Sequence, residues 1–126
     1  MARSSLVTIL SIFSGRPDPE LALAQQAIEE LGTRLAGSIG QQAAEYVEPP
    51  GLGYRGFTVT NAGGVSGVPA VCSVYAGTIN VPDAAGQVQT WADAQQVEQF
   101  LLALARDLGL GPVLDQVAGD SGRPTV

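Results

Sequence analysis

Apolar residues in this chain fall into runs with two different spacings. Residues 6–13 (LVTILSIF) are rich in β-branched side chains and apolar on both alternating sets, which predicts a strand covered on both faces. Residues 54–60 alternate in the manner of a strand, and 71–75 (VCSVY) form another β run. We expect these two runs to pair as an antiparallel hairpin around the turn-rich segment 61–67 (NAGGVSG).

Two stretches have helical spacing. Residues 19–35 predict a helix with Asp18 as N-cap and Pro19 at the first helical position. Residues 91–108 predict a second helix, capped by Thr90 with Asp93 three positions later, and ended by Gly109. The apolar stripe of the first helix consists of Leu21, Ala24, Ile28, Leu31 and Leu35.

The predicted order of elements is therefore β-α-β-β-α. This order is typical of an α/β (α+β) two-layer sandwich with a mainly antiparallel sheet and both helices on one face. We expect a single domain over residues 1–110 and a flexible C-terminal tail over 111–126. Because the first strand is apolar on both faces, its second face needs a cover, and a homodimer formed through that sheet face would supply one.

Charge narrows the range of partners. The chain has 126 residues, of which 45% are hydrophobic and 14% charged, and its net charge is −6. An acidic chain without clustered basic residues is a poor ligand for nucleic acid or an anionic membrane surface, so we expect neither as a partner. No apolar run approaches the roughly 20 residues of a membrane span. Cys72 is the single cysteine, so an intrachain disulfide is impossible and a cytoplasmic location is the simpler expectation.

The side-chain inventory excludes several chemistries. The sequence contains neither histidine nor lysine, and all six cations are arginines. A Ser-His-Asp triad, a Schiff-base lysine and a P-loop lysine are therefore impossible within this chain. One cysteine is too few for a zinc site, and no acidic cluster has calcium-loop spacing, so we predict no metal and no cofactor. The inventory favours a protein that is not an enzyme.

Two short segments carry a resemblance. Residues 13–19 read FSGRPDP and residues 51–57 read GLGYRGF. The pair resembles a family of small uncharacterised microbial, chiefly bacterial, proteins that have an FSGRPNP segment and an LGYRGF-like segment downstream. This chain differs at Asp18, where the family has Asn, and it lacks a tryptophan soon after the second proline. The resemblance implies no activity, since none is established for the family, but it draws attention to both loops.

Each of these segments places an arginine among glycine or proline residues, where the backbone allows a ligand to approach closely. A guanidinium group is a planar fork suited to carboxylate or phosphate. We therefore predict a site for an anionic small molecule or a peptide carboxylate. Its candidate ligand-binding residues are Ser14, Arg16, Tyr54 and Arg55. The alternative is that Arg16 and Arg55 pair with local carboxylates such as Asp18 and Glu48 and hold the loops in shape.

Three functions follow from this reading. The first is a non-enzymatic accessory or binding module that recognises an anionic ligand or peptide segment through the arginine-containing loops. The second is a small cofactor-free isomerase or lyase, in which arginine orients the substrate and Asp18, Tyr54 or Tyr75 moves protons. The third is a structural subunit that docks on a larger protein through its apolar sheet face or the region of Trp91.

Overall fold

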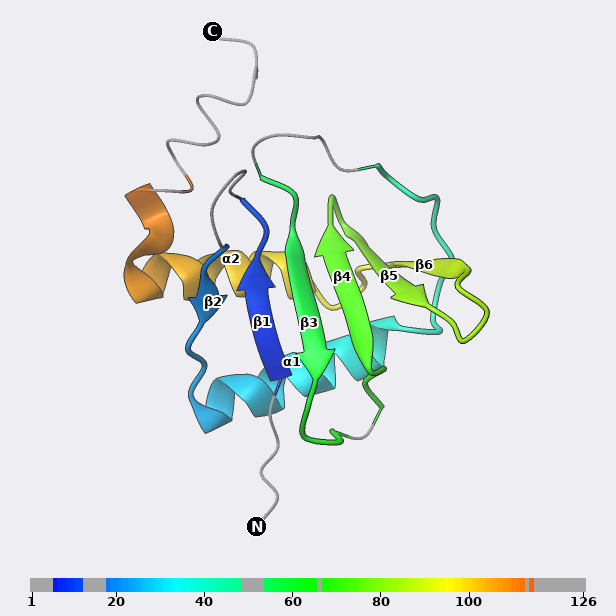
Figure 1. The fold of residues 1–126 in the computed structure, drawn as a ribbon, viewed down its shortest axis with the longest axis horizontal. Coiled ribbons are helices and arrows are strands. Elements are labelled where there is room, and N and C mark those ends of the chain that lie inside the picture. Colours follow the sequence, from blue (N-terminus) through cyan, green and yellow to red (C-terminus); the bar gives the residue numbers. More distant parts are fainter. Residues whose placement is uncertain (1–5, 13–17, 49–53, 66, 113, 115–126) are drawn as a thin grey trace, which may run out of the picture.

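The computed structural model describes residues 6–12, 18–48, 54–65, 67–112 and 114. Within these residues the chain is a mixed α+β fold, in which two α-helices accompany an open antiparallel sheet of six strands (Figure 1). The predicted α+β class and the antiparallel sheet are thereby confirmed. The predicted order of elements was incomplete, because it omitted three of the strands.

The elements follow one another along the chain as β1 (Leu6–Leu10), β2 (Glu20–Leu21), α1 (Gln25–Ser38), β3 (Phe57–Asn61), β4 (Val71–Tyr75), β5 (Thr78–Pro82), β6 (Val88–Ala92) and α2 (Val97–Ala105). A kinked segment, η1 (Arg106–Leu110), continues directly from α2, and its kink lies at Gly109, whose φ of 91° is left-handed. Across the sheet the strands are ordered β2-β1-β3-β4-β5-β6, and every neighbouring pair is antiparallel. Most neighbours in the chain are thus neighbours in the sheet.

The core forms on one face of the sheet, because buried and partly exposed residues alternate along β1, β3 and β4. The register places Leu10, Phe57, Val74 and Ile79 in one row across four strands, and all four are fully buried. Buried residues of the helices, among them Leu31 and Leu101, join the same cluster. In the view of Figure 1, α1 and α2 pass behind the strands.

The first predicted helix was wrong at its start. Glu20 and Leu21 form β2 against β1, and the Leu10 N–H donates to the Pro19 carbonyl at 2.9 Å. Pairing with β1 thus outweighs the helical spacing of the first apolar positions. The helix begins at Gln25 and continues to Ser38, and Asp18 is not its N-cap.

The second predicted helix was wrong over its first turns. Val88–Ala92, which includes Thr90 and Trp91, is strand β6, and the Thr90 hydroxyl donates to the Asn80 side chain at 2.7 Å. The helix begins at Val97, where Asp93 accepts the N–H groups of Val97 at 2.6 Å and of Glu98 at 2.8 Å. Asp93 therefore supplies the carboxylate that caps this helix.

The predicted hairpin is confirmed. β3 and β4 are antiparallel, with Val59 opposite Cys72. The strand predicted over 54–60 begins at Phe57 instead, because Gly56 interrupts the regular pairing just before it.

Leu114 lies beyond the domain limit predicted at residue 110 and is buried in the core. The limits 1–110 and 111–126 stay predictions.

Candidate functional site

Residues 54–56 enter the sheet through a β-bulge beside β1. The Ser11 N–H donates to the Gly56 carbonyl at 2.9 Å, and the Arg55 N–H donates to the Ser11 carbonyl at 2.8 Å. Two residues of one strand thus face one residue of its neighbour, as in a bulge. Gly56 has a left-handed φ of 86°, and a Cβ there would lie 2.1 Å from the Val74 carbonyl oxygen. Only glycine fits at this position.

Arg55 reaches Asp18 at the end of β1. The guanidinium Nη2 lies 3.9 Å from Asp18 Oδ2, and both side chains are about one quarter exposed, at 28% and 24%. The other Asp18 oxygen accepts the Ile12 N–H at 3.0 Å. The alternative in which Arg55 pairs with a local carboxylate is therefore observed for Asp18. A pair this exposed contributes little to stability, of the order of 1 kcal/mol or less.

Tyr54 is tied to the first turn of α2. Its hydroxyl donates to Glu98 Oε2 at 2.6 Å, and the same carboxylate accepts the N–H groups of Ala76 at 3.1 Å and of Gly77 at 2.8 Å. Glu98 is only 8% exposed. Its three hydrogen-bond donors compensate for the water that the carboxylate loses by burial. The cluster joins the turn between β4 and β5 to α2 and to the segment that carries Arg55.

The Tyr54 ring also lies among aromatic neighbours. Its centroid is 6.1 Å from that of Phe57, nearly edge-on, and 5.8 Å from that of Tyr75. Burial, and then the hydrogen bond to the Glu98 carboxylate, raise the pKa of Tyr54 above its ordinary value. The phenol therefore keeps its proton near neutral pH and is a poor general base there.

The structure brings together four of the predicted site residues in two contacts. Asp18 lies against Arg55, and Tyr54 lies against Tyr75. Ser14 and Arg16 lie outside the described residues, so the predicted approach of Arg16 to Arg55 stays a prediction. Glu98 was missed by the sequence reasoning, because helical spacing alone gave no reason to expect a buried carboxylate there. The one feature of the sequence that could have indicated Glu98 is its place in the chain, five residues after the capping Asp93.

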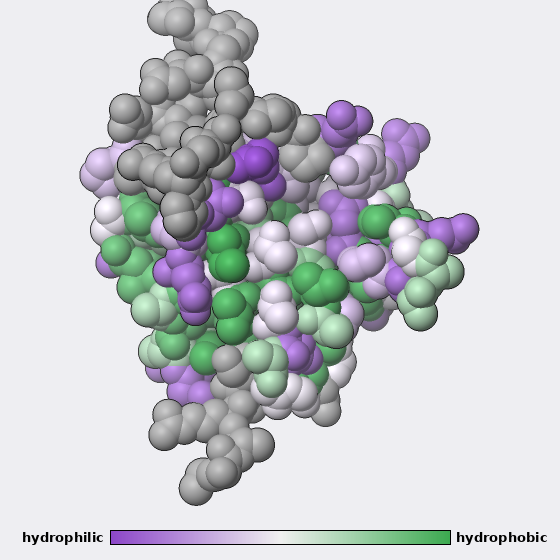
Figure 2. All heavy atoms as spheres, viewed as in Figure 1, coloured by the Kyte–Doolittle hydropathy of each residue, from purple (hydrophilic) through white to green (hydrophobic). Residues whose placement is uncertain are grey.

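The outer face of β1, β3 and β4 carries no charged side chain, and the exposed Glu20 of β2 borders it opposite Ile9. By alternation, this face carries the uncharged side chains of β1, β3 and β4 that do not enter the core. These are Val7, Ile9, Thr58, Thr60, Val71, Ser73 and Tyr75, all partly or fully exposed. We call this set the neutral face. Figure 2 views the molecule from this side, and apolar and weakly polar side chains occupy the centre of the picture.

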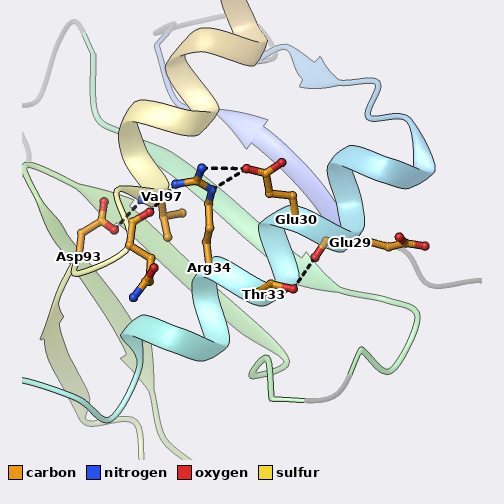
Figure 3. Close-up of polar contacts among 7 residues, drawn as sticks. Glu29, Glu30, Thr33, Arg34, Asp93 and Val97 are labelled. Carbon is orange, nitrogen blue, oxygen red and sulfur yellow. Dashed lines mark hydrogen bonds and ion pairs between the residues drawn. The ribbon is translucent and has the colours of Figure 1, made fainter.

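The two helices are joined on the other side of the molecule by Arg34, shown in Figure 3. Its guanidinium donates to Glu30 at 2.8 Å and 3.0 Å and to the Gln95 carbonyl at 2.6 Å, and it lies 4.8 Å from the Phe100 ring centroid. The Gln95 N–H in turn donates to the Ser38 hydroxyl at 3.0 Å. These contacts fix the loop before α2, and therefore the position of Glu98.

Two surface hollows also lie along α1. One, of about 220 Å³, is lined by Ala24, Gln26, Ala27, Glu30, Phe100 and Leu104. The other, of about 430 Å³, is lined by Glu29, Gly32, Thr33, Ala36 and Val65. Neither includes Arg55 or Tyr54.

Among the residues described, no group of three or more His, Cys, Asp or Glu side chains could hold a metal ion. No helix in the described part of the chain is long and apolar enough to cross a membrane.

Comparison of the chain with protein-family models, with curated proteins and with solved structures finds no match. The function is therefore inferred from the geometry around Arg55 and from the neutral face.

Proposed function

We propose that this protein is a non-enzymatic binding module that takes an anionic small molecule or a peptide segment at Arg55. The observation that carries the proposal is the setting of this guanidinium. It is partly exposed, it lies in a bulge whose next residue can only be glycine, and it has the Asp18 carboxylate beside it. The planar, bidentate geometry of a guanidinium group suits a ligand carboxylate or phosphate.

The neutral face favours a peptide among the anionic ligands. Ile9 and Thr58 pair directly across β1 and β3, and both are partly exposed. An extended peptide could lay uncharged side chains along this face while its carboxylate meets Arg55. An enzyme is the weaker candidate, because the Tyr54 proton is held by Glu98 and points into the protein.

The test is a titration followed by NMR. The probes are inorganic phosphate, an acetylated hexapeptide with a free C-terminal carboxylate, and the same peptide as its C-terminal amide. We expect the free carboxylate to shift resonances around Arg55, and Arg55→Gln to weaken binding by about tenfold or more, since a charge-assisted hydrogen bond is lost. Arg106→Gln is the matched control and should bind as the wild type does. Equal binding by Arg55→Gln, or no binding of any probe, would contradict the proposal.

A second copy of the chain is the second candidate partner. In this arrangement both helices cover one face of the sheet and the neutral face packs against its symmetry mate, as predicted from the two apolar sides of the first strand. Three aliphatic side chains that are only partly buried, Val7, Ile9 and Val71, favour it. Light scattering should then give a dimeric mass for the wild type and a monomeric mass for Thr58→Arg. A monomeric wild type at micromolar concentration would exclude it.

The proposed compartment is the cytoplasm, because the lone Cys72 is buried and free.

A further inference from the structure

We infer that Tyr54 and Glu98 are positioning residues for Arg55. They hold the segment that carries this guanidinium in a fixed orientation relative to the sheet, so that the binding group is preorganised before any ligand arrives. The inference rests on the proposed function for its purpose, but the orientation itself is a property of the free protein.

The first step is the anchor on the residue before Arg55. The Tyr54 hydroxyl donates to Glu98 at 2.6 Å, and its ring is enclosed by Phe57 and Tyr75. A phenol held both at its tip and along its ring has little rotational freedom. The backbone of Tyr54 is therefore tied to α2 across 44 positions of sequence.

The second step is the fixation of Glu98 itself. The carboxylate accepts two successive backbone N–H groups, from Ala76 and Gly77, in the tight turn between β4 and β5. Both residues have positive φ, 52° and 77°, so the turn directs its amides toward one point, as in a backbone anion nest. Ala76 adopts a conformation that L side chains rarely take, and the charge on Glu98 compensates part of that strain.

The third step is the residue after Arg55. Gly56 cannot be replaced without a clash between a Cβ and the Val74 carbonyl, and the Arg55 N–H is itself bonded to the Ser11 carbonyl at 2.8 Å. Arg55 thus lies between two residues whose places are set by contacts to β4 and α2. The backbone on both sides of Arg55 is therefore held, which reduces the number of positions its guanidinium can reach. A binding group held this way loses less entropy when a ligand binds.

The test uses Tyr54→Phe, which keeps the ring and removes the hydroxyl, with Tyr46→Phe as the matched control. Tyr46 is 57% exposed. We measure ¹⁵N relaxation at the side-chain Nε of Arg55 and Arg34 in the free protein at a temperature where both variants are folded. The order parameter of Arg55 should fall in Tyr54→Phe and in Glu98→Gln, while that of Arg34 stays constant. Tyr46→Phe should change neither.

A purely structural role for the hydrogen bond would lower the unfolding temperature and leave Arg55 as ordered as in the wild type. That result would overturn the inference. The carboxylate-peptide titration is then repeated with Tyr54→Phe, where we expect about fivefold to tenfold weaker binding. If the wild type binds no probe while Arg55 still loses order in Tyr54→Phe, the proposed function fails and the positioning role stands.

Discussion

The Tyr54 hydroxyl and the Glu98 carboxylate are joined by a 2.6 Å hydrogen bond, although 44 positions separate them in sequence. The bond connects the entry to β3 with the first turn of α2. The Glu98 carboxylate also accepts two backbone N–H groups from the turn between β4 and β5. One buried carboxylate thus joins α2, which the sheet ladder does not hold, to two places at the edge of neighbouring strands.

Removal of this carboxylate should cost much of the stability of the protein. Glu98→Ala leaves the hydroxyl of the partly buried Tyr54 and the amides of Ala76 and Gly77 without their acceptor, and the two amides belong to exposed residues that water can reach. We expect a loss of about 2 kcal/mol in the free energy of unfolding, measured in urea. Glu29→Ala is the control, because Glu29 is exposed and its carboxylate accepts only a 3.4 Å contact from Gln25. Equal, small losses in both variants would contradict the role of Glu98.

Tyr54 should make stability depend on pH in the alkaline range. An unfolded tyrosine loses its proton near pH 10, whereas burial and the Glu98 carboxylate raise the pKa of Tyr54 in the folded protein. The unfolded state therefore releases the proton first. The stabilisation is complete below pH 10 and is lost as the pH rises further, by about 1.4 kcal/mol per pH unit.

The measurement is the difference in unfolding free energy between the wild type and Tyr54→Phe, followed from pH 8 to pH 11.5. The difference should be constant up to about pH 10 and then change in favour of the phenylalanine variant. Taking the difference cancels the titration of other groups, including Cys72. A difference that stays flat to pH 11.5 would show that the Tyr54 pKa is not raised on folding.

Cys72 should react slowly in the folded protein. The thiol lies on β4 within the core at 1% exposure, and burial raises its pKa from 9.0 to about 12. At pH 8 the thiolate is therefore scarce as well as enclosed. With a chromogenic disulfide reagent we expect one thiol per chain to react at once in concentrated urea, and only on the timescale of unfolding without it. Rapid reaction of the native protein would place Cys72 outside the core.

Hydrophobic patterning predicted the centre of this fold well. The runs around Thr8, Val59 and Cys72 were recognised as strands, and these residues do lie side by side in the sheet. In each case both the local propensity and the long-range pairing favour a strand, so the prediction needed no knowledge of the partner. The antiparallel α+β class followed from these three runs.

The errors lie where local and long-range preferences disagree. Leu21 fits the helical spacing of the apolar positions in α1, yet it lies in β2 and pairs with Thr8 of β1. Trp91 begins a stretch that is helical in spacing, yet it lies in β6, opposite Ile79 of β5. Pairing energy comes from strands distant in sequence, and a spacing rule has no access to it.

The candidate site was predictable only in part. Arg55 and Tyr54 stood out because glycines surround them, and Asp18 was named as a possible partner of Arg55, which the ion pair bears out. Glu98 was not found, because its role depends on a turn in which Ala76, a residue type that rarely adopts the left-handed region, does so together with Gly77. Burial of a carboxylate is decided by tertiary contacts that the sequence does not display.

The last prediction separates backbone conformation from available space, with two glycines that share nearly the same φ. Gly56 (86°) and Gly86 (84°) both need the left-handed region, so alanine at either position should cost about 1–2 kcal/mol for conformation alone. At Gly86 a Cβ would meet no atom within 4 Å, whereas at Gly56 it would lie 2.1 Å from the Val74 carbonyl oxygen. Gly86→Ala should therefore lose only that amount in urea unfolding. Gly56→Ala should lose several kcal/mol more, because β3 and β4 must separate to admit the methyl group. A similar loss in both variants would mean that the bulge beside Ser11 can relax, and that Arg55 is not held by the residue that follows it.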